Sequence, residues 1–412
     1  MVEAMAWGGT PAYRRQAVKE CLDTISVLRG YREPMTGEKW LTPAESERRL
    51  LAQVNGIIAL GPRALDQVIE LALDPDVPDP GRVFAVLFVV GCVSGREWLD
   101  RARDIFVAAV LRNAAESGAA VEALSLSVNP ELATFLTSFL GDERPRLRAA
   151  SIRILAFRGA LTEADWVDAM NHPDVTLVAA ALSAPLRGYD RSSCARVLQP
   201  LFARLDAEWL VRPALRAGLS LRLNAAHACA VRIAQSDPSW ADAANIVAMF
   251  GNLSDAPHVR ALLDGPGIEA GVRAAAILGS IGLVPDLLEV LHRADLASET
   301  AVLVKQALAA ITGIPFTDVA DAARALDLWS QHASGFHAGV RYRQGRPLTL
   351  EALLQLLRAG SGLRSVRQNL YLELLAATES QVPPFSAYDF VRVQADSLRH
   401  IERWLAELRV PH

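Results

Sequence analysis

The arginines near the end of the chain form its densest group of residues suited to recognition chemistry. Residues 341–367 contain six arginines and one acidic residue, Glu351. The arginines are Arg341, Arg343, Arg346, Arg358, Arg364 and Arg367. Planar guanidinium groups pair with carboxylates and phosphates through two parallel hydrogen bonds. We therefore predict that Arg341, Tyr342, Arg343 and Arg346 form part of a surface that binds a partner. A loop held by salt bridges from these arginines to neighbouring acids is the plainer interpretation of the same residues.

Histidine and glycine motifs elsewhere do not combine into a catalytic or metal site. Glu289 and His292 have ExxH spacing, but the carboxylate-bridged metal bundles that use it need two such pairs and further glutamates. His332 and His337 are five residues apart, which places them on different faces of a helix. The glycines of Gly265–Gly267 follow no predicted strand, which excludes a dinucleotide-binding turn. We expect no catalytic residue, no cofactor and no metal, so that the chain is not an enzyme.

Composition and charge narrow the class of protein. The 412 residues carry a formal net charge of −4, so the chain as a whole lacks the basic surface of a nucleic-acid-binding protein. Its four cysteines lie far apart without CxxC spacing, as expected for reduced thiols in a cytoplasmic protein. No signal peptide is visible at the start. The longest apolar run, Val83–Val93, is shorter than the roughly 20 residues that span a bilayer and is expected to be a buried helix.

A loose pattern of paired helices recurs along the chain. Short polar turns precede helices rich in small residues in four clear cases, which are Asp142–Phe157, Pro173–Leu186, Gly265–Ile281 and Leu356–Ala376. Abundant Ala and Leu favour helix, and the alternation typical of strands is nearly absent. Small residues let neighbouring helices approach closely, so each pair can bury its apolar stripe against the next pair. The pattern predicts an all-α fold in which irregular antiparallel helix pairs form an α-solenoid.

The regularity of the pairs predicts four regions. Residues 1–127 are expected to form an N-terminal helical region, and residues 128–313 the central repeats. An irregular connecting segment, residues 314–347, would act as a hinge or joint, and residues 348–412 would form a last repeat with a capping helix. Thr42–Glu45 and Thr162–Asp165 have the sequence of a helix-capping box, in which the threonine hydroxyl accepts from the backbone three residues on.

Several segments resemble known repeats. ERPRLRAASIRILAFRG from Glu143 and AGVRAAAILGSIG from Ala270 look like HEAT repeats of the short bacterial, phycobilisome-lyase-like type. Three further stretches, Glu45–Ala64, Ala307–Ile314 and Gly339–Pro347, resemble in order and spacing a proteobacterial family of uncharacterised HEAT-like proteins often encoded near type VI secretion genes. The resemblance implies a HEAT-like fold and a link to secretion, and it carries over no catalytic residue.

The predicted function is that of a non-catalytic scaffold or adaptor that binds another protein, because stacked helix pairs offer extended contact surfaces. The concave surface formed by the second helices of the pairs is the expected contact face, with Gly339–Pro347 at its edge. Two alternatives stay open. One is a nucleic-acid-binding HEAT-like protein with a DNA glycosylase-like fold, which would bind most strongly at low salt. The other is a lyase-type HEAT protein, which would need a pocket with clustered titratable groups.

Overall fold

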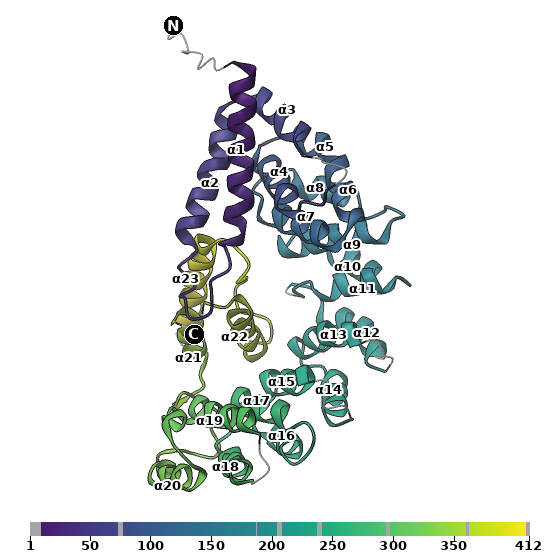
Figure 1. Ribbon diagram of the computed structural model, residues 1–412. Helices are drawn as coiled ribbons and strands as arrows, with labels where there is room; N and C mark the ends of the chain where they lie inside the picture. Colours follow the sequence, from purple (N-terminus) through teal and green to yellow (C-terminus); the bar gives the residue numbers. More distant parts are fainter. Residues whose placement is uncertain are drawn as a thin grey trace. The chain divides into compact units, whose positions relative to one another are not determined.

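Nearly all of the regular structure of this chain is α-helical. The computed structural model describes residues 10–72, 77–186, 188–203, 208–236, 241–293, 297–359 and 362–408 (Figure 1). The strands among these residues are β1 and β2, each two residues long. The chain divides into two compact units, which we call unit 1 (Met1–Pro185, Ser361–Arg364 and Ser386–Asp396) and unit 2 (Leu186–Gly360, Ser365–Phe385 and Ser397–His412). The all-α fold class predicted from the sequence is therefore confirmed.

Unit 1 is built mainly from the first eleven helices. They are α1 (Pro11–Gly30), α2 (Ala44–Ala59), α3 (Pro62–Glu70), α4 (Pro80–Cys92), α5 (Glu97–Arg101), α6 (Arg103–Arg112), α7 (Ala114–Leu126), α8 (Leu132–Thr137), α9 (Pro145–Phe157), α10 (Glu163–Met170) and α11 (Val175–Leu182). One row of helices packs in the order α4, α7, α9, α11, and α6, α8 and α10 each pack on a member of that row. α1 packs on α2, α3 and α4 at the start of the unit.

Helix α4 is the apolar run predicted to be buried. Asp79 caps its start by accepting from the backbone N–H of Arg82 at 2.8 Å, and Pro80 fills the first helical position, where no N–H is needed. Every residue from Val83 to Gly91 is buried, which confirms the prediction of a helix covered on all sides. None of the helices in the described parts of the chain is both long and apolar enough to cross a membrane.

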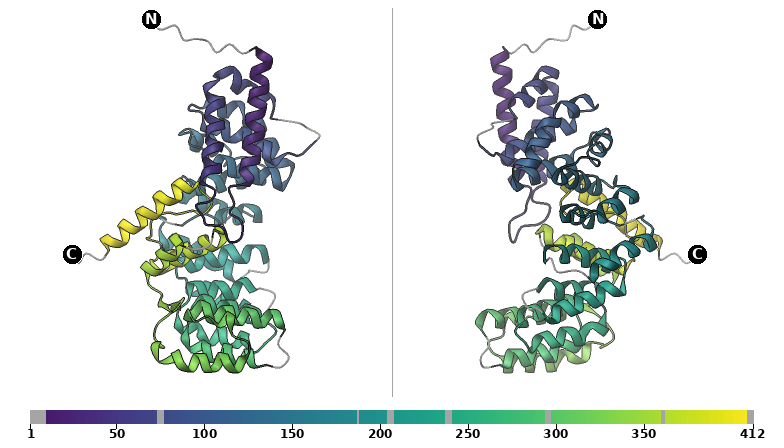
Figure 2. Two further views of the ribbon diagram at one scale, coloured as in Figure 1. Left: turned by 60° about the vertical axis from the view of Figure 1, so that its left-hand side comes forward. Right: turned by 90° about the vertical axis from the view of Figure 1, so that its right-hand side faces the viewer.

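Unit 2 begins with four successive helix pairs. They are α12 (Arg191–Phe202) with α13 (Glu208–Ser220), α14 (Asn224–Ser236) with α15 (Ala241–Phe250), α16 (Ala256–Leu263) with α17 (Ile268–Leu278), and α18 (Val284–His292) with α19 (Ser298–Thr312). The second helices pack on one another in the order α13, α15, α17, α19, and the first helices pack in the order α12, α14, α16, α18 to form the other layer (Figure 2). Small residues permit this approach, since a Cβ on Gly271 of α17 would lie 3.0 Å from side-chain atoms of Leu262 and Leu263 in α16.

The remaining elements of unit 2 follow the last pair. They are α20 (Ala322–His332), β1 (Tyr342–Arg343), β2 (Arg346–Pro347), α21 (Leu350–Ala359), α22 (Arg364–Ala377) and α23 (Val391–Glu407), with short 3-10 turns at Phe316–Asp318 and Ala333–Gly335. The first residue of α22 and the first six of α23 belong to unit 1. Residues 314–347, predicted to be an irregular connection, thus contain a three-turn helix and a hairpin. The division between the units at Pro185 also differs from the four regions predicted from helix regularity.

Capping by threonine is realised at one of the two predicted positions. Thr162 accepts from the backbone N–H of Asp165 at 3.1 Å, as predicted, and α10 starts beside it. α2 instead starts at Ala44 after a turn in which Ala44 donates to the carbonyl of Leu41, and its N-cap residue, Pro43, makes no side-chain cap bond. The prediction of a capping box at Thr42 was therefore wrong, because the chain enters α2 through that turn.

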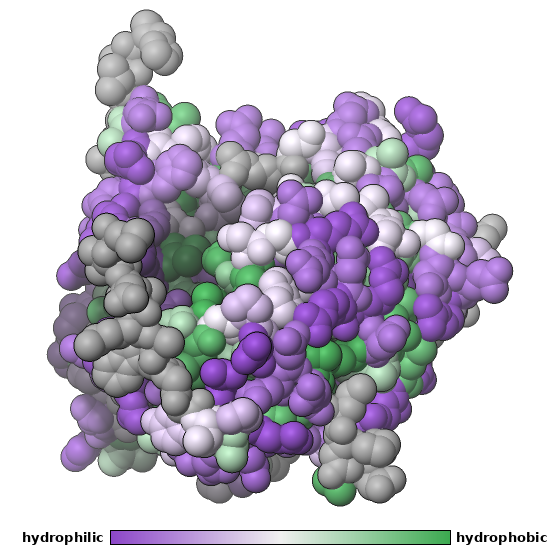
Figure 3. All heavy atoms as spheres, turned by 90° about the horizontal axis from the view of Figure 1, so that it is seen from above, coloured by the Kyte–Doolittle hydropathy of each residue, from purple (hydrophilic) through white to green (hydrophobic). Residues whose placement is uncertain are grey.

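Hydrophilic residues cover most of the molecular face drawn in Figure 3, and hydrophobic residues appear between them in small groups. Single exposed apolar side chains are normal on proteins. Several lie close together in sequence at the end of α1 and in the turn after it, where Val27, Tyr31, Met35 and Leu41 are all more than half exposed.

Candidate functional site

The segment that contains the predicted partner-binding residues is a tight β-hairpin. Arg343 pairs with Arg346 and Tyr342 with Pro347, so Gln344 and Gly345 form a two-residue turn. Both turn residues have positive φ, +52° and +73°, which is the geometry of the turn that matches the twist of paired strands. Gly345 adopts this conformation without strain, because glycine has no Cβ.

The hairpin is fixed to the carboxyl ends of two helices. α17 and α19 each end in a left-handed glycine, Gly279 and Gly313. The backbone N–H of Tyr342 donates to the carbonyl of Gly279 at 2.7 Å, and that of Gln344 donates to Ala310 at 2.6 Å. Carbonyls in the last turn of a helix have no partner within the helix, so the hairpin satisfies groups that would otherwise need water.

Arg341 extends this capping to a third helix. Its Nε donates to the carbonyl of Leu278 at 2.8 Å, and its Nη1 donates to Gly251 at 3.0 Å, just beyond α15. Nη2 lies 3.2 Å from the carbonyls of Ala248 and Ile277. A cation at helix carboxyl ends also interacts favourably with the helix dipoles. Burial lowers the pKa of Arg341, which Glu373 and Asp255 partly offset.

Arg343 and Tyr342 are likewise engaged inside unit 2. Arg343 Nη2 lies 3.1 Å from Oε2 of Glu373 in α22 and donates to the carbonyl of Ile277 at 2.8 Å. Glu373 is 6% exposed, and burial raises its pKa despite the attraction of Arg343 and Arg341. The buried Tyr342 ring packs edge-on against Phe336, with ring centroids 5.0 Å apart. Of the four residues predicted to bind a partner, only Arg346 has an exposed side chain.

The other arginines of the stretch also meet acceptors in the protein. Arg358 pairs with Glu402 of α23 at 2.9 Å. Arg367 is 1% exposed, and its Nε donates to the carbonyl of Leu357 at 3.3 Å. Arg364 pairs with Glu33 at 3.1 Å and belongs to unit 1, whereas the others belong to unit 2. Five of the six arginines of the stretch therefore contact acceptors within the protein, whereas Arg346 is exposed.

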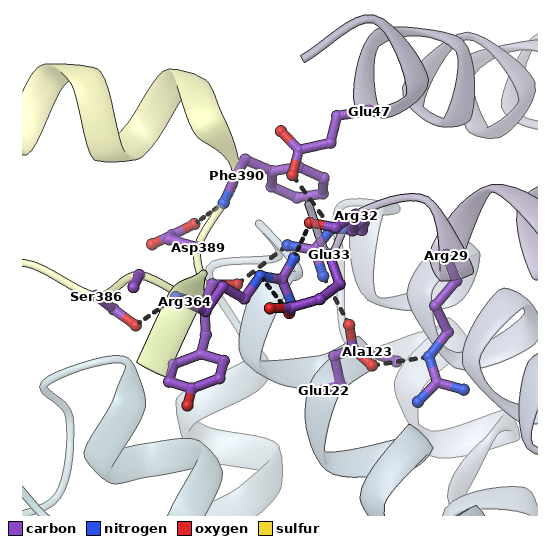
Figure 4. A network of polar contacts seen from close by, with 12 residues as sticks. Arg29, Arg32, Glu33, Glu47, Glu122, Ala123, Arg364, Ser386, Asp389 and Phe390 are labelled. Atoms are coloured by element: carbon purple, nitrogen blue, oxygen red, sulfur yellow. Dashed lines mark hydrogen bonds and ion pairs between the residues drawn. The ribbon is translucent and has the colours of Figure 1, made fainter. Parts of the chain in front are cut away.

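A second cluster of charged groups is buried in unit 1 (Figure 4). Arg32 follows α1 and is 1% exposed, and its Nε lies 3.3 Å from Oε1 of the equally buried Glu47 in α2. Its Nη1 lies 2.6 Å from Oε1 of Glu122 in α7, and the other oxygen of Glu122 accepts from Arg29 at 2.7 Å. Leaving one such charge buried without its partner is strongly destabilising, so the cluster fixes α1, α2 and α7 in one arrangement.

Residues from near the end of the sequence complete the same cluster. Arg32 Nη2 donates to the carbonyl of Tyr388 at 3.0 Å, and its guanidinium lies 4.8 Å from the ring centre of Phe390. The backbone N–H of Val391 donates to Oε2 of Glu47 at 2.7 Å. Burial raises the pKa of Glu47, although Val391 and Arg32 both favour its charged form. The cluster could not be predicted from the sequence, because its members share no motif and residues 388–391 lie more than 300 positions after Arg32 and Glu47.

Two surface grooves offer space for a ligand. One, of about 510 Å³, lies between α1 and the start of α2 and includes Asp23, Val27, Tyr31 and Arg49. The other, of about 620 Å³, lies between α14 and α16 in unit 2 and includes two histidines. No sequence motif predicted a site there, although the Asn252–Asp255 cap beside one of the histidines has a recognisable spacing.

Metal ligation finds no support in the described residues. They contain no group of three or more His, Cys, Asp or Glu side chains placed to hold a metal ion. Glu289 and His292, which have ExxH spacing, are both exposed on α18.

Comparison of the sequence with known protein families finds no match, and comparison with curated proteins finds none either. The case for a function therefore depends on the geometry of the chain itself.

Proposed function

We propose that this protein is a HEAT-like α-solenoid that acts as a non-catalytic scaffold or adaptor for another protein. The observation that carries the proposal is the repeated stacking of helix pairs within each unit. In unit 2 the second helices of four successive pairs pack on one another, and the four first helices form the other layer. Arrays of this kind bind partners along extended surfaces made by successive repeats. The resemblance to proteins encoded near type VI secretion genes makes a secretion-associated partner the first candidate.

Contacts within unit 2 limit where a partner can bind. Part of the face presented by second helices is occupied by α22, since Arg216 of α13 lies 3.2 Å from Asn369, and Arg222, just after α13, pairs with Glu379 at 3.0 Å. The hairpin keeps one exposed charge, Arg346, beside the exposed Gln344 at its turn. We therefore assign Arg346 to the edge of the partner-binding surface, with Arg341 and Arg343 holding the hairpin in place.

The test is affinity capture from a lysate of the native host, with companions identified by mass spectrometry. Tagged wild-type protein is compared with the Arg346→Glu variant and with Arg15→Glu, a charge reversal at an exposed arginine of α1 in unit 1. We expect one stoichiometric protein that survives nuclease treatment and moderate salt. Arg346→Glu should lower its affinity about tenfold, or about 1.4 kcal/mol, whereas Arg15→Glu should leave it unchanged.

Two results would count against this assignment. Equal recovery of the partner by wild type and Arg346→Glu would remove the hairpin from the contact surface. Recovery of the bare chain, or of nucleic acid alone, would contradict the scaffold function. Reversing Arg341 and Arg343 as well would obscure the test, because their loss would disturb the helix ends that they cap.

A further inference from the structure

The groove between α1 and the start of α2 is lined by large apolar side chains that stay exposed. Val27 and Tyr31 are 61% and 63% exposed and lie four residues apart, so they share one face of α1. Leu28, which is 5% exposed, lines the groove beside them. Tyrosine is enriched where proteins bind one another, because its ring adds apolar area while its hydroxyl can still form hydrogen bonds. This combination is typical of a contact surface for another protein chain.

Two opposite charges line the same groove, Asp23 from α1 and Arg49 from α2. Arg49 is exposed, and its guanidinium has no ion pair or hydrogen bond among the residues that the structure describes. Glu45, one turn earlier in α2, is paired with Arg48 at 2.7 Å. Asp23 pairs with Arg82 through Oδ1, and its side chain remains 50% exposed. Both charges can therefore meet a group that approaches the groove from outside.

The two charges lie toward different ends of the groove. α1 and α2 pack side by side and run in opposite directions, since Arg32 after the end of α1 contacts Glu47 near the start of α2 (Figure 1). Asp23 lies nine positions before Arg32, and Arg49 lies two positions after Glu47. With a rise of about 1.5 Å per residue, Asp23 is about 10 Å farther along the helix pair than Arg49. The groove therefore has an acidic end and a basic end.

A surface with this arrangement is complementary to itself. In a twofold-symmetric dimer, a residue of one copy that contacts a second residue of the other copy is matched by the reciprocal contact. An axis in the plane of the groove, midway between the two charges and perpendicular to the line that joins them, places Asp23 of each copy against Arg49 of the other. Val27 lies between the levels of the two charges along α1, so the apolar side chains of both copies meet near that axis.

We propose that a second copy of this chain covers the groove, and that the protein is a homodimer in which Arg49 of each copy pairs with Asp23 of the other. Tyr31 and Val27 supply the apolar contact. Charge complementarity favours a second copy over a different protein, because the same groove supplies both members of each ion pair. The inference goes beyond the scaffold function and does not depend on it, since the chain would dimerise whether or not its stacked helices bind another protein.

Sedimentation velocity of the full-length protein across micromolar concentrations tests the dimer. We expect a monomer–dimer equilibrium that added sodium chloride weakens, since salt screens ion pairs near a surface. Tyr31→Ser should raise the dissociation constant at least about tenfold, because a tyrosine at the centre of a contact contributes strongly to binding. Tyr13→Ser is the matched control and should leave the constant unchanged, since Tyr13 is a 68% exposed tyrosine near the start of α1, outside the groove.

Charge reversal then identifies the pairing. Arg49→Glu and Asp23→Arg should each weaken the dimer at least about tenfold, because each variant alone would place like charges together at two positions. An equimolar mixture of the two variants should dimerise about as tightly as wild type. The mixed dimer keeps one wild-type ion pair and gains one pair with its charges exchanged.

Three results would overturn the proposal. A chain that stays monomeric throughout the micromolar range would leave the groove to a different protein. A dimer that Tyr31→Ser and Arg49→Glu leave intact would have its interface elsewhere. A mixture of the reversed variants that dimerises no better than either alone would exclude the pairing of Asp23 with Arg49. Tyr31→Ser and Arg49→Glu change exposed side chains alone, so they test the interface even if Asp23→Arg, which also breaks the pair with Arg82, lowers the unfolding midpoint.

Discussion

Ionising the half-buried carboxyl of Asp389 in the folded protein has a free-energy cost, so its contribution to stability depends on pH. Its Oδ1 accepts from the backbone N–H of Phe390 at 2.8 Å, within the segment of unit 1 drawn in Figure 4. Burial nevertheless raises the pKa of this carboxyl above its ordinary value of 3.8, against the opposing effects of that hydrogen bond, Arg32 and Arg158. Above pH 3.8 the folded protein therefore binds more protons at this site than the unfolded chain does.

Asp389→Asn should remove this cost. The favourable contribution of the wild-type side chain is fully present below pH 3.8 and is lost as pH rises through the raised pKa. We expect the Asn variant to have a higher thermal unfolding midpoint than wild type at pH 7, with the difference shrinking as pH falls toward 4. Midpoints measured at four pH values would show it. A variant less stable than wild type at pH 7 would mean that attraction to Arg158 and Arg32 exceeds the effect of burial.

Residue types in the arginine stretch could be recognised from sequence, but their roles could not. The sequence showed that Arg341 and Arg343 were candidates for planar hydrogen bonding, and the structure gives both that role with partners inside the chain. The four acceptors described for Arg341 are all backbone carbonyls, which every residue possesses, so no sequence pattern distinguishes them. The interpretation of a loop held by salt bridges to acids agrees with Arg343, which pairs with Glu373, but not with Arg341, which donates to backbone carbonyls.

At the scale of elements, the hairpin joins helix ends that would otherwise be separate. It contacts α17 and α19 through backbone hydrogen bonds, and Arg341 adds α15. The segment predicted to be a hinge is thus tied to three consecutive second helices. Tight contact is possible because Gly313 has no side chain, since a Cβ there would lie 2.6 Å from the carbonyl oxygen of Gln344.

Gly313→Ala should therefore destabilise unit 2. The residue has φ of +70°, a conformation that costs other residues about 1–2 kcal/mol, and the hairpin backbone would also have to move away. We expect a loss of about 2 kcal/mol or more in the free energy of unfolding, measured by denaturant titration. Gly335→Ala is the matched control, because it has open space and no positive φ, and it should change stability little. A tolerated Gly313→Ala would show that the hairpin is loosely attached.

Two predictions that depend on local sequence signals were confirmed, whereas the capping box at Thr42, which is equally local, was wrong. The cap at Thr162 and the buried helix α4 depend on neighbouring residues alone, and both predictions were confirmed. The hairpin turn at Gln344 and Gly345 was not predicted, because its two strands are too short to show alternation. Its position is set by the ends of α17 and α19, which are more than thirty residues earlier in the sequence.

At the scale of the whole chain, unit 1 is assembled from three separate stretches of sequence. Residues 361–364 and 386–396 belong with the first 185 residues, although unit 2 lies between them in sequence. Phe390 is 9% exposed and packs against Phe88 of α4, with ring centroids 5.8 Å apart. Helix periodicity predicts regions that are continuous in sequence, so it could not reveal this return of the chain. The core of unit 1 is complete only after nearly the whole protein has been made.

A fragment of residues 1–186 should therefore be less stable by itself than in the full chain, and a peptide of residues 384–397 should restore it. Removing Phe390 from its site costs about 3 kcal/mol, and Arg32 and Glu47 would lose further partners. We expect saturating peptide to raise the thermal unfolding midpoint of the fragment by about 5 °C or more. The same peptide with Phe390→Ala should have much less effect. A fragment that unfolds at the same temperature with and without peptide would mean that unit 1 folds independently of its distant segments, and that the buried charges of Figure 4 find other partners.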